Sequence, residues 1–287
     1  MTTAMFLLKE LSRADIDFFR SLVWDYYAVN RREFVWRFEP DPYAVVVSEF
    51  MLQQTQTERV AQKYPPFLAR FSSWRSLAAA PLADVIIAWQ GLGYNRRARF
   101  LHLLAGRVIN EFDGVLPNDP CVLKTCSGIG PNTAGSICAF AFNKPIVFIE
   151  TNIRAVFIHT FFSDRDDVAD AELLPLIKQT LDENNPREWY YALMDYGVYL
   201  KKQHKNPTRK SKHHTIQSKF SGSDRQIRGA ILRQLSLSVA KNCMLESLFE
   251  VLSDSYGCDP VRAQKILDGL IAEGMVSRVH GGDMICL

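Results

Sequence analysis

The acid at position 150 is the residue whose place in the sequence first suggests chemistry. Glu150 ends the apolar run Pro145–Ile149 and stands directly before Thr151 and Asn152. A carboxyl group at such a junction can be partly buried, where it can handle a proton or stabilise a positive charge. The simpler interpretation is a solvated loop acid, because a lone Glu at the end of an apolar run is commonly where the chain meets water.

A second feature with chemical potential is the pair of glycines in "CSGIGPNTAGS". Gly128 and Gly130 permit a sharp turn, and Pro131 suits the first position of the helix that follows. The amides of such a turn and the positive end of the helix can bind a phosphate oxygen. We interpret the segment as a helix-hairpin-helix signal, with a simple turn between two helices as the alternative.

The elements that must position these residues are predicted to be helices almost throughout. Apolar residues recur three and four positions apart, and Pro or Gly separates the segments. The clearest helical segments are 14–30, 50–71, 81–93, 94–112 and 187–202.

The C-terminal segment has a different pattern. Three short helices within 223–274 precede two short strands about a turn at Gly281 and Gly282. Three helices and a terminal hairpin are typical of a winged helix. Its third helix carries acids such as Glu273 beside bases such as Arg262. This mixture of charges fits a helix that packs against protein as well as it fits one that reads DNA bases.

Composition and charge restrict the class of protein. The 287 residues, 47% of them hydrophobic, can bury a full core. We expect a soluble, cytoplasmic protein, associated with the nucleoid if bacterial, because no apolar run approaches the roughly 18 residues of a membrane span and no signal peptide is recognised. The formal charge is only +3, but Lys201–Lys219 contains seven Lys or Arg, three His and no acid. This run predicts either a solvated linker or a segment that lies along a phosphate backbone.

The residues that most often hold metals are not grouped. Six cysteines occur without a CxxC pair, so reduced core thiols are expected rather than a disulfide framework. His102 and His159 show no ligand spacing. We therefore predict no metal site.

Four segments, taken together and in order, resemble a known family. They are "WRFEPDPYAVVVSEFMLQQTQ", "GLGYNRRARFLH", "CSGIGPNTAGS" and "IETNIRAV". They resemble the HhH-GPD superfamily of DNA glycosylases, and within it most nearly the adenine-DNA glycosylases of the MutY type. The resemblance covers about Phe18 to Tyr199 and implies a flipped-out target nucleotide in double-stranded DNA.

The fold that the resemblance implies is all-α, a two-subdomain helix-hairpin-helix glycosylase fold, followed here by the small winged-helix (α+β) domain. The core would occupy 1–205, with a six-helix subdomain at about 41–144 and a second helical subdomain from 1–40 and 145–205. A basic linker at 206–223 would lead to the winged-helix domain at 224–287. We expect a monomer.

The resemblance also assigns roles to residues of this sequence. Glu49 matches the acid that protonates the departing purine, and its apolar flanks would raise its pKa by desolvation. Glu150 stands where the family has an aspartate that stabilises the charge on the sugar, and Asn152 matches an asparagine that steadies the site. The base pocket is predicted at Trp36, Arg37, Leu52, Asp195 and Asn132. Contacts to DNA are predicted for Gln54 and Tyr94, which would fill or wedge the base stack, and for Arg96, Arg97, Gly128, Gly130 and Thr133.

Three departures from the family pattern carry expectations of their own. The segment from Tyr196 to Asp224 has no cysteine, so no iron-sulfur cluster is expected. Asn132 stands where bifunctional relatives have a Schiff-base lysine, and an amide cannot be that nucleophile, so strong lyase activity is not expected. A winged helix stands in place of the Nudix-like domain of MutY.

These observations together predict a monofunctional DNA glycosylase of base excision repair. Adenine opposite guanine or 8-oxoguanine is the first expected substrate. Removal of uracil or thymine opposite guanine is one alternative, and a non-catalytic DNA-binding protein is the other. A binding protein would have no need of two carboxylates at the positions of Glu49 and Glu150.

Overall fold

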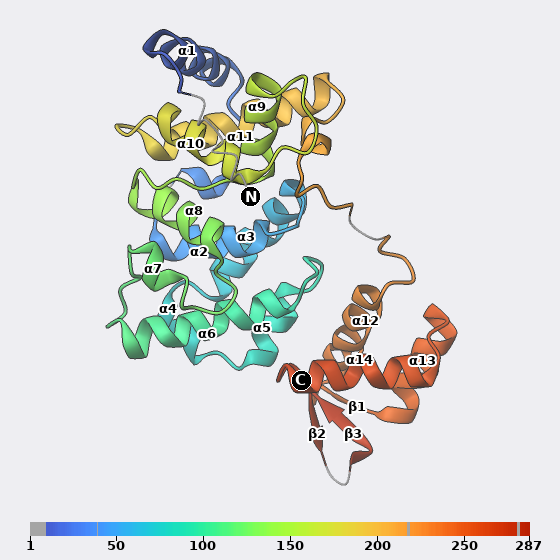
Figure 1. Cartoon of the computed structure of the whole chain (residues 1–287). Helices are drawn as coiled ribbons and strands as arrows, with labels where there is room; N and C mark the ends of the chain where they lie inside the picture. Colours follow the sequence, from blue (N-terminus) through green and yellow to red (C-terminus); the bar gives the residue numbers. More distant parts are fainter. Residues whose placement is uncertain (1–9, 39, 217–218, 280–281) are drawn as a thin grey trace, which may run out of the picture. The chain divides into compact units, whose positions relative to one another are not determined.

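The computed structural model describes residues 10–38, 40–216, 219–279 and 282–287. It is helical almost throughout, with a small antiparallel sheet at the C-terminal end, which confirms the predicted fold class (Figure 1). The helices before the basic run are α1 (Arg13–Asn30), η1 (Val35–Arg37), α2 (Pro42–Leu52), α3 (Thr57–Arg70), α4 (Trp74–Ala79), α5 (Leu82–Trp89), α6 (Arg96–Glu111), α7 (Pro120–Leu123), α8 (Pro131–Phe142), α9 (Thr151–Phe161), α10 (Asp170–Thr180) and α11 (Pro186–Gln203). Within the described ranges, no helix combines the length and apolarity needed to cross a membrane.

The chain divides into two compact units, each built from segments distant in sequence. The first comprises Met1–Val45, Asn118–Thr125 and Ile129–Ile216. The second comprises Val46–Pro117, Cys126–Gly128 and Gln217–Leu287. The subdomain boundaries expected at 41 and 144 differ from this division, because α8 packs in the first unit. Phe148 there lies so close to Gly135 of α8 that an added Cβ would stand 2.6 Å from it.

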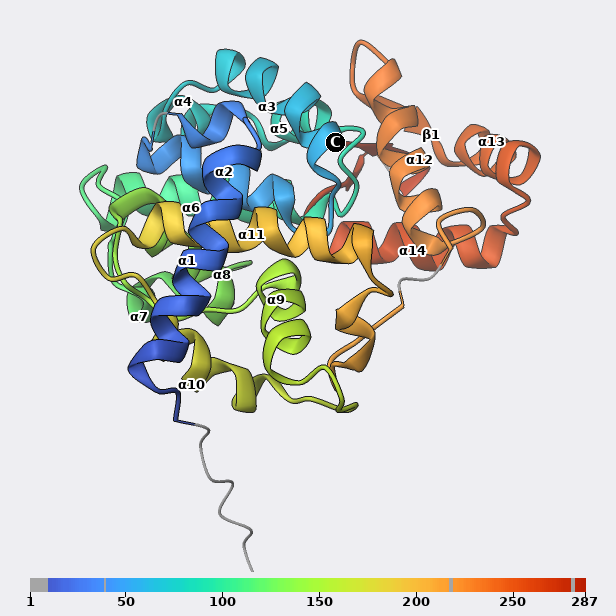
Figure 2. The ribbon, with the colours of Figure 1, turned by 90° about the horizontal axis from the view of Figure 1, so that it is seen from above.

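The first unit is organised around α11, which α1 and α9 flank (Figure 2). Its core is rich in aromatic residues, and the ring of Phe19 in α1 lies 5.3 Å from that of Phe157 in α9. The two helices lie very close at Gly197 of α11, where an added Cβ would stand 2.3 Å from the carbonyl oxygen of Asn152 in α9. Only glycine fits there without a backbone shift, so α11 fixes the start of α9.

In the second unit, α2 is a buried helix with almost no polar face. Val46, Val47, Phe50 and Met51 are fully buried, as expected of a helix that is apolar on all sides. The helix ends at Leu52 and α3 begins only at Thr57, so the continuous helix predicted over 50–71 is wrong.

The glycine-rich turn is present between α7 and α8, as the sequence predicts. Gly128 has φ +83°, and an added Cβ would stand 2.7 Å from Cδ2 of Phe100. Glycine is therefore required both by the backbone and by the space. Gly130 is the N-cap of α8 and Pro131 is its first residue.

The C-terminal segment forms a winged helix. Its elements are α12 (Asp224–Leu237), β1 (Asn242–Met244), α13 (Leu245–Tyr256), α14 (Pro260–Ala272), β2 (Ser277–Val279) and β3 (Met284–Cys286). The strand order is β1-β3-β2, with both pairs antiparallel. The sequence predicted β2 and β3 but not the three-residue β1. Gly281 of the predicted turn lies outside the described residues.

The winged helix packs against α5 of the second unit. Ile86 of α5 is buried in the apolar core of the winged helix. Gln90 donates a hydrogen bond of 2.8 Å to Oγ of Ser236 in α12, and Lys241 forms an ion pair with Asp84 of α5. Apolar and polar contacts therefore join this domain to the helices of the second unit.

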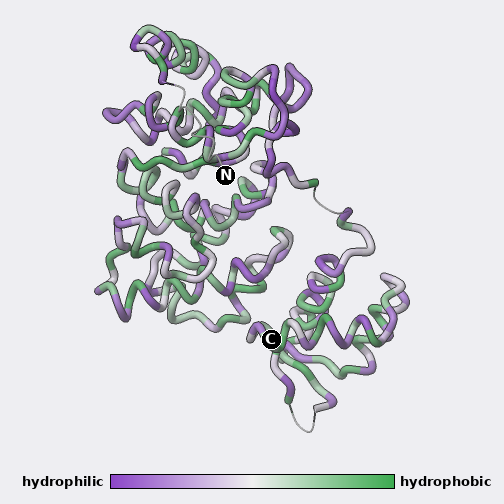
Figure 3. Tube along the Cα trace, viewed as in Figure 1, coloured by the Kyte–Doolittle hydropathy of each residue, from purple (hydrophilic) through white to green (hydrophobic). Residues whose placement is uncertain are grey.

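The basic run is not wholly a linker. Its first part forms η2 (Pro207–Lys210), in which Pro207 and Thr208 are buried. The backbone of Val168 bonds to the residues on both sides of Ser211. The linker expected at 206–223 therefore begins too early, because Pro207 and Thr208 pack in the first unit instead of facing water. Hydrophilic residues predominate between α11 and residue 216 (Figure 3).

Candidate active site

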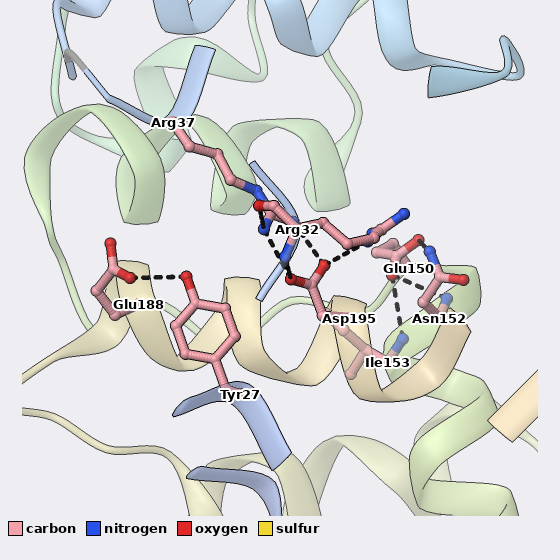
Figure 4. Close-up of polar contacts among 8 residues, drawn as sticks. All are labelled: Tyr27, Arg32, Arg37, Glu150, Asn152, Ile153, Glu188 and Asp195. Atoms are coloured by element: carbon pink, nitrogen blue, oxygen red, sulfur yellow. Dashed lines mark hydrogen bonds and ion pairs between the residues drawn. The ribbon is translucent and has the colours of Figure 1, made fainter. Parts of the chain in front are cut away.

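Glu150 is held at the N-terminus of α9, in the first unit (Figure 4). It is the N-cap residue, and its Oε1 accepts hydrogen bonds from the backbone N–H of Asn152 at 2.8 Å and of Ile153 at 3.1 Å. The side-chain amide of Asn152 donates to Oε2 at 3.3 Å. These donors fix the direction of a half-buried carboxylate. Glu150 is therefore not a freely solvated loop acid.

The surroundings of Glu150 act on its protonation in opposite directions. Burial raises the pKa of Glu150, while the hydrogen bond from Ile153 and the positive charge of Lys201 lower it. Burial also lowers the pKa of Lys201, and the charge of Glu150 opposes that shift. Glu150 and Lys201 are thus opposite charges that both lose contact with water, an arrangement found at functional sites and in structural ion pairs.

Two polar groups beside Glu150 complete this half of the site. The backbone N–H of Ile149 donates to Oδ1 of Asn132 at 3.3 Å, which ties the start of α8 to the segment before Glu150. The Oδ1 atom of Asn152 is buried and accepts no hydrogen bond from the described residues. As packed here, this acceptor is closed to solvent and lacks a partner among the described residues.

Asp195 and Arg37, two of the predicted base-pocket residues, belong to a buried ion-pair cluster of the first unit. Asp195 of α11 is 2% exposed, and its carboxylate receives hydrogen bonds from the side chains of Arg32 at 2.7 Å and Arg37 at 2.9 Å (Figure 4). Arg37 also stacks on Tyr191, and Trp36 is 5% exposed. The bonds of Arg32 and Arg37 to Asp195 fix the segment after α1 on α11. The base-pocket role expected of Asp195, Arg37 and Trp36 stays a prediction.

Glu49 and Leu52 lie in the second unit, on α2. Both are half-buried, whereas the residues between them are fully buried. A carboxylate carried by an otherwise buried helix has little freedom to move, which suits an acid that must meet one substrate atom. The roles predicted for these two residues stay predictions.

The two residues predicted to wedge the base stack share an unusual backbone. Gln54, after α2, has φ +54°, and Tyr94, before α6, has φ +47°. Residues other than glycine rarely adopt this left-handed backbone conformation, and those that do are often found at functional sites. Gln54 is exposed and Tyr94 is half-buried.

Arg97 holds both of these loops. It is 6% exposed. Its guanidinium donates to the carbonyls of Phe50, Met51, Gln53, Leu92 and Gly93 and to the hydroxyl of Thr55. Burial lowers its pKa to about 10. The predicted phosphate contact of Arg97 is wrong, because its N–H groups donate to groups inside the protein. Two of the acceptors are the carbonyl oxygens of Phe50 and Met51, near the end of α2.

The other predicted DNA contacts lie nearer the surface. Arg96 is exposed and forms an ion pair with Glu273 at the end of α14. Gly130 has no atom within 4 Å of an added Cβ, and Thr133 is half-buried in the first turn of α8. Their contact with DNA stays a prediction.

Sequence reasoning missed Gly197 and Lys201 of α11. The two are four residues apart, so they share one face of the helix, and that face abuts the start of α9. A glycine inside an amphipathic helix was the available signal, since it marks close approach of another backbone. In the described part of the chain, no group of three or more His, Cys, Asp or Glu could hold a metal.

Comparison with known proteins agrees with this fold. Residues 47–178 match the family described as HhH-GPD superfamily base excision DNA repair protein. The chain is 30% identical over 275 residues to an adenine DNA glycosylase of Mycolicibacterium smegmatis, which covers 90% of this chain and 92% of that one. It is also 30% identical over 197 residues to the human adenine DNA glycosylase, covering 64% of this chain and 36% of that one.

Solved structures show the same fold. A thermostable thymine-DNA glycosylase has a TM-score of 0.58 at 24% identity and covers 64% of this chain and 86% of its own. An endonuclease III–DNA complex has a TM-score of 0.54 at 18% identity and covers 66% of this chain and 86% of its own. The chain belongs to the HhH-GPD superfamily of base excision DNA repair proteins. It is a DNA N-glycosylase, an enzyme that acts on DNA.

Proposed function

We propose that this enzyme is a monofunctional glycosylase that removes adenine paired with guanine or 8-oxoguanine. The observation that carries the mechanism is the half-buried carboxylate of Glu150, fixed by two amides at the start of α9. The choice of adenine is supported by the relatives, which are adenine DNA glycosylases at 30% identity over most of the chain.

The reaction divides between two acids. Glu49 protonates a ring nitrogen of the adenine, so that the base leaves as a neutral molecule and its bonding electrons do not remain as a charge. Positive charge develops on the sugar, and the Glu150 carboxylate stabilises it. A water then adds to the sugar carbon, and its proton passes to the Glu49 carboxylate that the first step leaves. Lys201 balances the charge of Glu150 when no substrate is bound.

The decisive experiment is an excision assay on a panel of duplexes. Adenine opposite guanine and opposite 8-oxoguanine should be removed, whereas thymine and uracil opposite guanine should remain. Strand cleavage should appear only after alkali, and borohydride should trap no covalent complex, because Asn132 offers no amine. Preferred excision of thymine or uracil would replace adenine as the proposed substrate.

We also propose that the enzyme works without an iron-sulfur cluster. The region from Tyr196 to Asp224 contains no cysteine, and four thiolates are the usual ligands of such clusters. Protein purified without oxygen should show no visible iron-sulfur absorbance and no bound iron by elemental analysis, while excising its substrate. Stoichiometric iron that survives gel filtration would overturn this proposal.

A further inference from the structure

The winged-helix domain directly contacts Tyr94, one of the two residues predicted to wedge the base stack. The hydroxyl of Tyr94 accepts a hydrogen bond of 2.6 Å from Nη1 of Arg225, in the first turn of α12. The guanidinium carbon of Arg225 also lies 5.4 Å from the centre of the Tyr94 ring. One arginine thus holds both the polar tip and the aromatic ring of this side chain.

Tyr94 requires support of this kind. Its φ of +47° is unfavourable for a bulky side chain and persists only where neighbouring contacts impose it. Arg97 supplies contacts from within, with its guanidinium carbon 5.5 Å from the ring centre and a long hydrogen bond to the Tyr94 carbonyl. Arg225 is the second cation on this residue, and it comes from the winged helix.

Arg225 is presented by a firmly attached surface. The apolar contact through Ile86 and the ion pair of Lys241 with Asp84 fix the winged helix on α5. At the other end of this contact, Glu273, the C-cap residue of α14, pairs with Arg228 of α12 and with Arg96 of α6. The C-terminal end of α14, the third helix of the winged helix, therefore packs against α6 and α12.

We propose that Arg225 is a positioning residue for base extrusion. It holds Tyr94 in the conformation in which this residue enters the base stack, and the winged-helix domain thereby assists excision through α12. A wedge that is already in place avoids the cost of ordering it when DNA binds. The inference rests on the proposed function, because it gives Tyr94 the wedge role that the resemblance to DNA glycosylases implies.

The test compares Arg225→Ala with Arg233→Ala in the full chain. Arg233 is a matched control, since it lies on the same helix and also donates to a tyrosine hydroxyl, that of Tyr256 within the winged helix. In the free protein, Arg225→Ala should speed amide hydrogen exchange over Gly91–Asn95 about tenfold, and Arg233→Ala should leave it unchanged. Single-turnover excision should fall about tenfold for Arg225→Ala only, with affinity for undamaged duplex within about twofold.

A second comparison shows whether Arg225 acts through Tyr94. In the Tyr94→Phe background, which keeps the ring and lacks the hydroxyl, Arg225→Ala should slow excision much less than in the wild-type chain. Equal behaviour of the Arg225 and Arg233 variants would overturn the proposal, and so would a full loss in the Tyr94→Phe background. If the wild-type chain removes no base from any duplex, the proposed function fails. The exchange comparison alone then decides whether Arg225 holds the Tyr94 loop.

Discussion

Replacement of Glu49 by Gln is expected to slow base excision about a thousandfold, which is roughly 4 kcal/mol of transition-state free energy. The side chain keeps its size on the buried helix α2, but it can no longer give a proton to the departing base. Affinity for the duplex should stay within about twofold, because the phosphate contacts are unchanged. Single-turnover excision and a binding titration on the same duplex measure the two effects separately.

A matched substitution controls for the removal of one negative charge. Glu250→Gln changes an exposed acid on α13 and should leave both rate and affinity at the wild-type level. Retained excision by the Glu49→Gln variant would show that another group donates the proton. A large loss of duplex affinity would mean that Glu49 serves DNA binding instead.

Glu150→Gln should slow excision about a hundredfold, or roughly 3 kcal/mol, because the charge that stabilises the sugar cation is lost. The amide oxygen of Gln can still accept from the N–H groups of Asn152 and Ile153, so urea unfolding should change little. Glu150→Asp keeps the charge on a shorter arm and should give a rate between the other two. A wild-type rate for Glu150→Gln would show that Glu150 only caps α9 and takes no part in excision.

The pH dependence gives an independent check on Glu150. Burial raises its pKa, and only its ionised form stabilises the cation, so excision should decline as the pH falls through this raised pKa. Glu150→Gln should lose this acid limb of the pH profile. In the window between the ordinary carboxyl pKa and the raised one, the folded chain keeps a proton that the unfolded chain releases. The free energy of unfolding should therefore decrease as pH rises through that window, and less so in Glu150→Gln.

Local signals in the sequence were sufficient for part of this description. The turn at Gly128 to Pro131 follows from residue types that fix the backbone wherever they occur, and it was predicted correctly. Glu150 was singled out because the chain changes there from apolar to polar residues, but the helix that begins at Thr151 was not predicted. The winged helix followed from the spacing of apolar residues, apart from the three-residue strand β1.

The failures involve interactions between distant segments. Arg96 and Arg97 are adjacent and of one type, yet Arg97 is buried because carbonyl groups more than forty residues earlier need a donor. The same bonds explain why the helix predicted over 50–71 stops at Leu52. The two arginine partners of Asp195 were not predicted either, because they lie over 150 positions away in the chain. The spacing of apolar residues predicts which face of a helix is buried. It does not predict which polar group will pair with a buried charge.

The position of Arg97 makes the loops of Gln54 and Tyr94 a single cooperative element. One guanidinium shares its hydrogen bonds between the two loops, so distortion of either loop weakens the bonds that the other receives. Substitutions at Gln54 and Tyr94 should consequently be non-additive, although forty residues separate them in the chain. A substitution that changes the conformation of one loop will therefore change the other loop as well. Natural selection then acts on the two loops together.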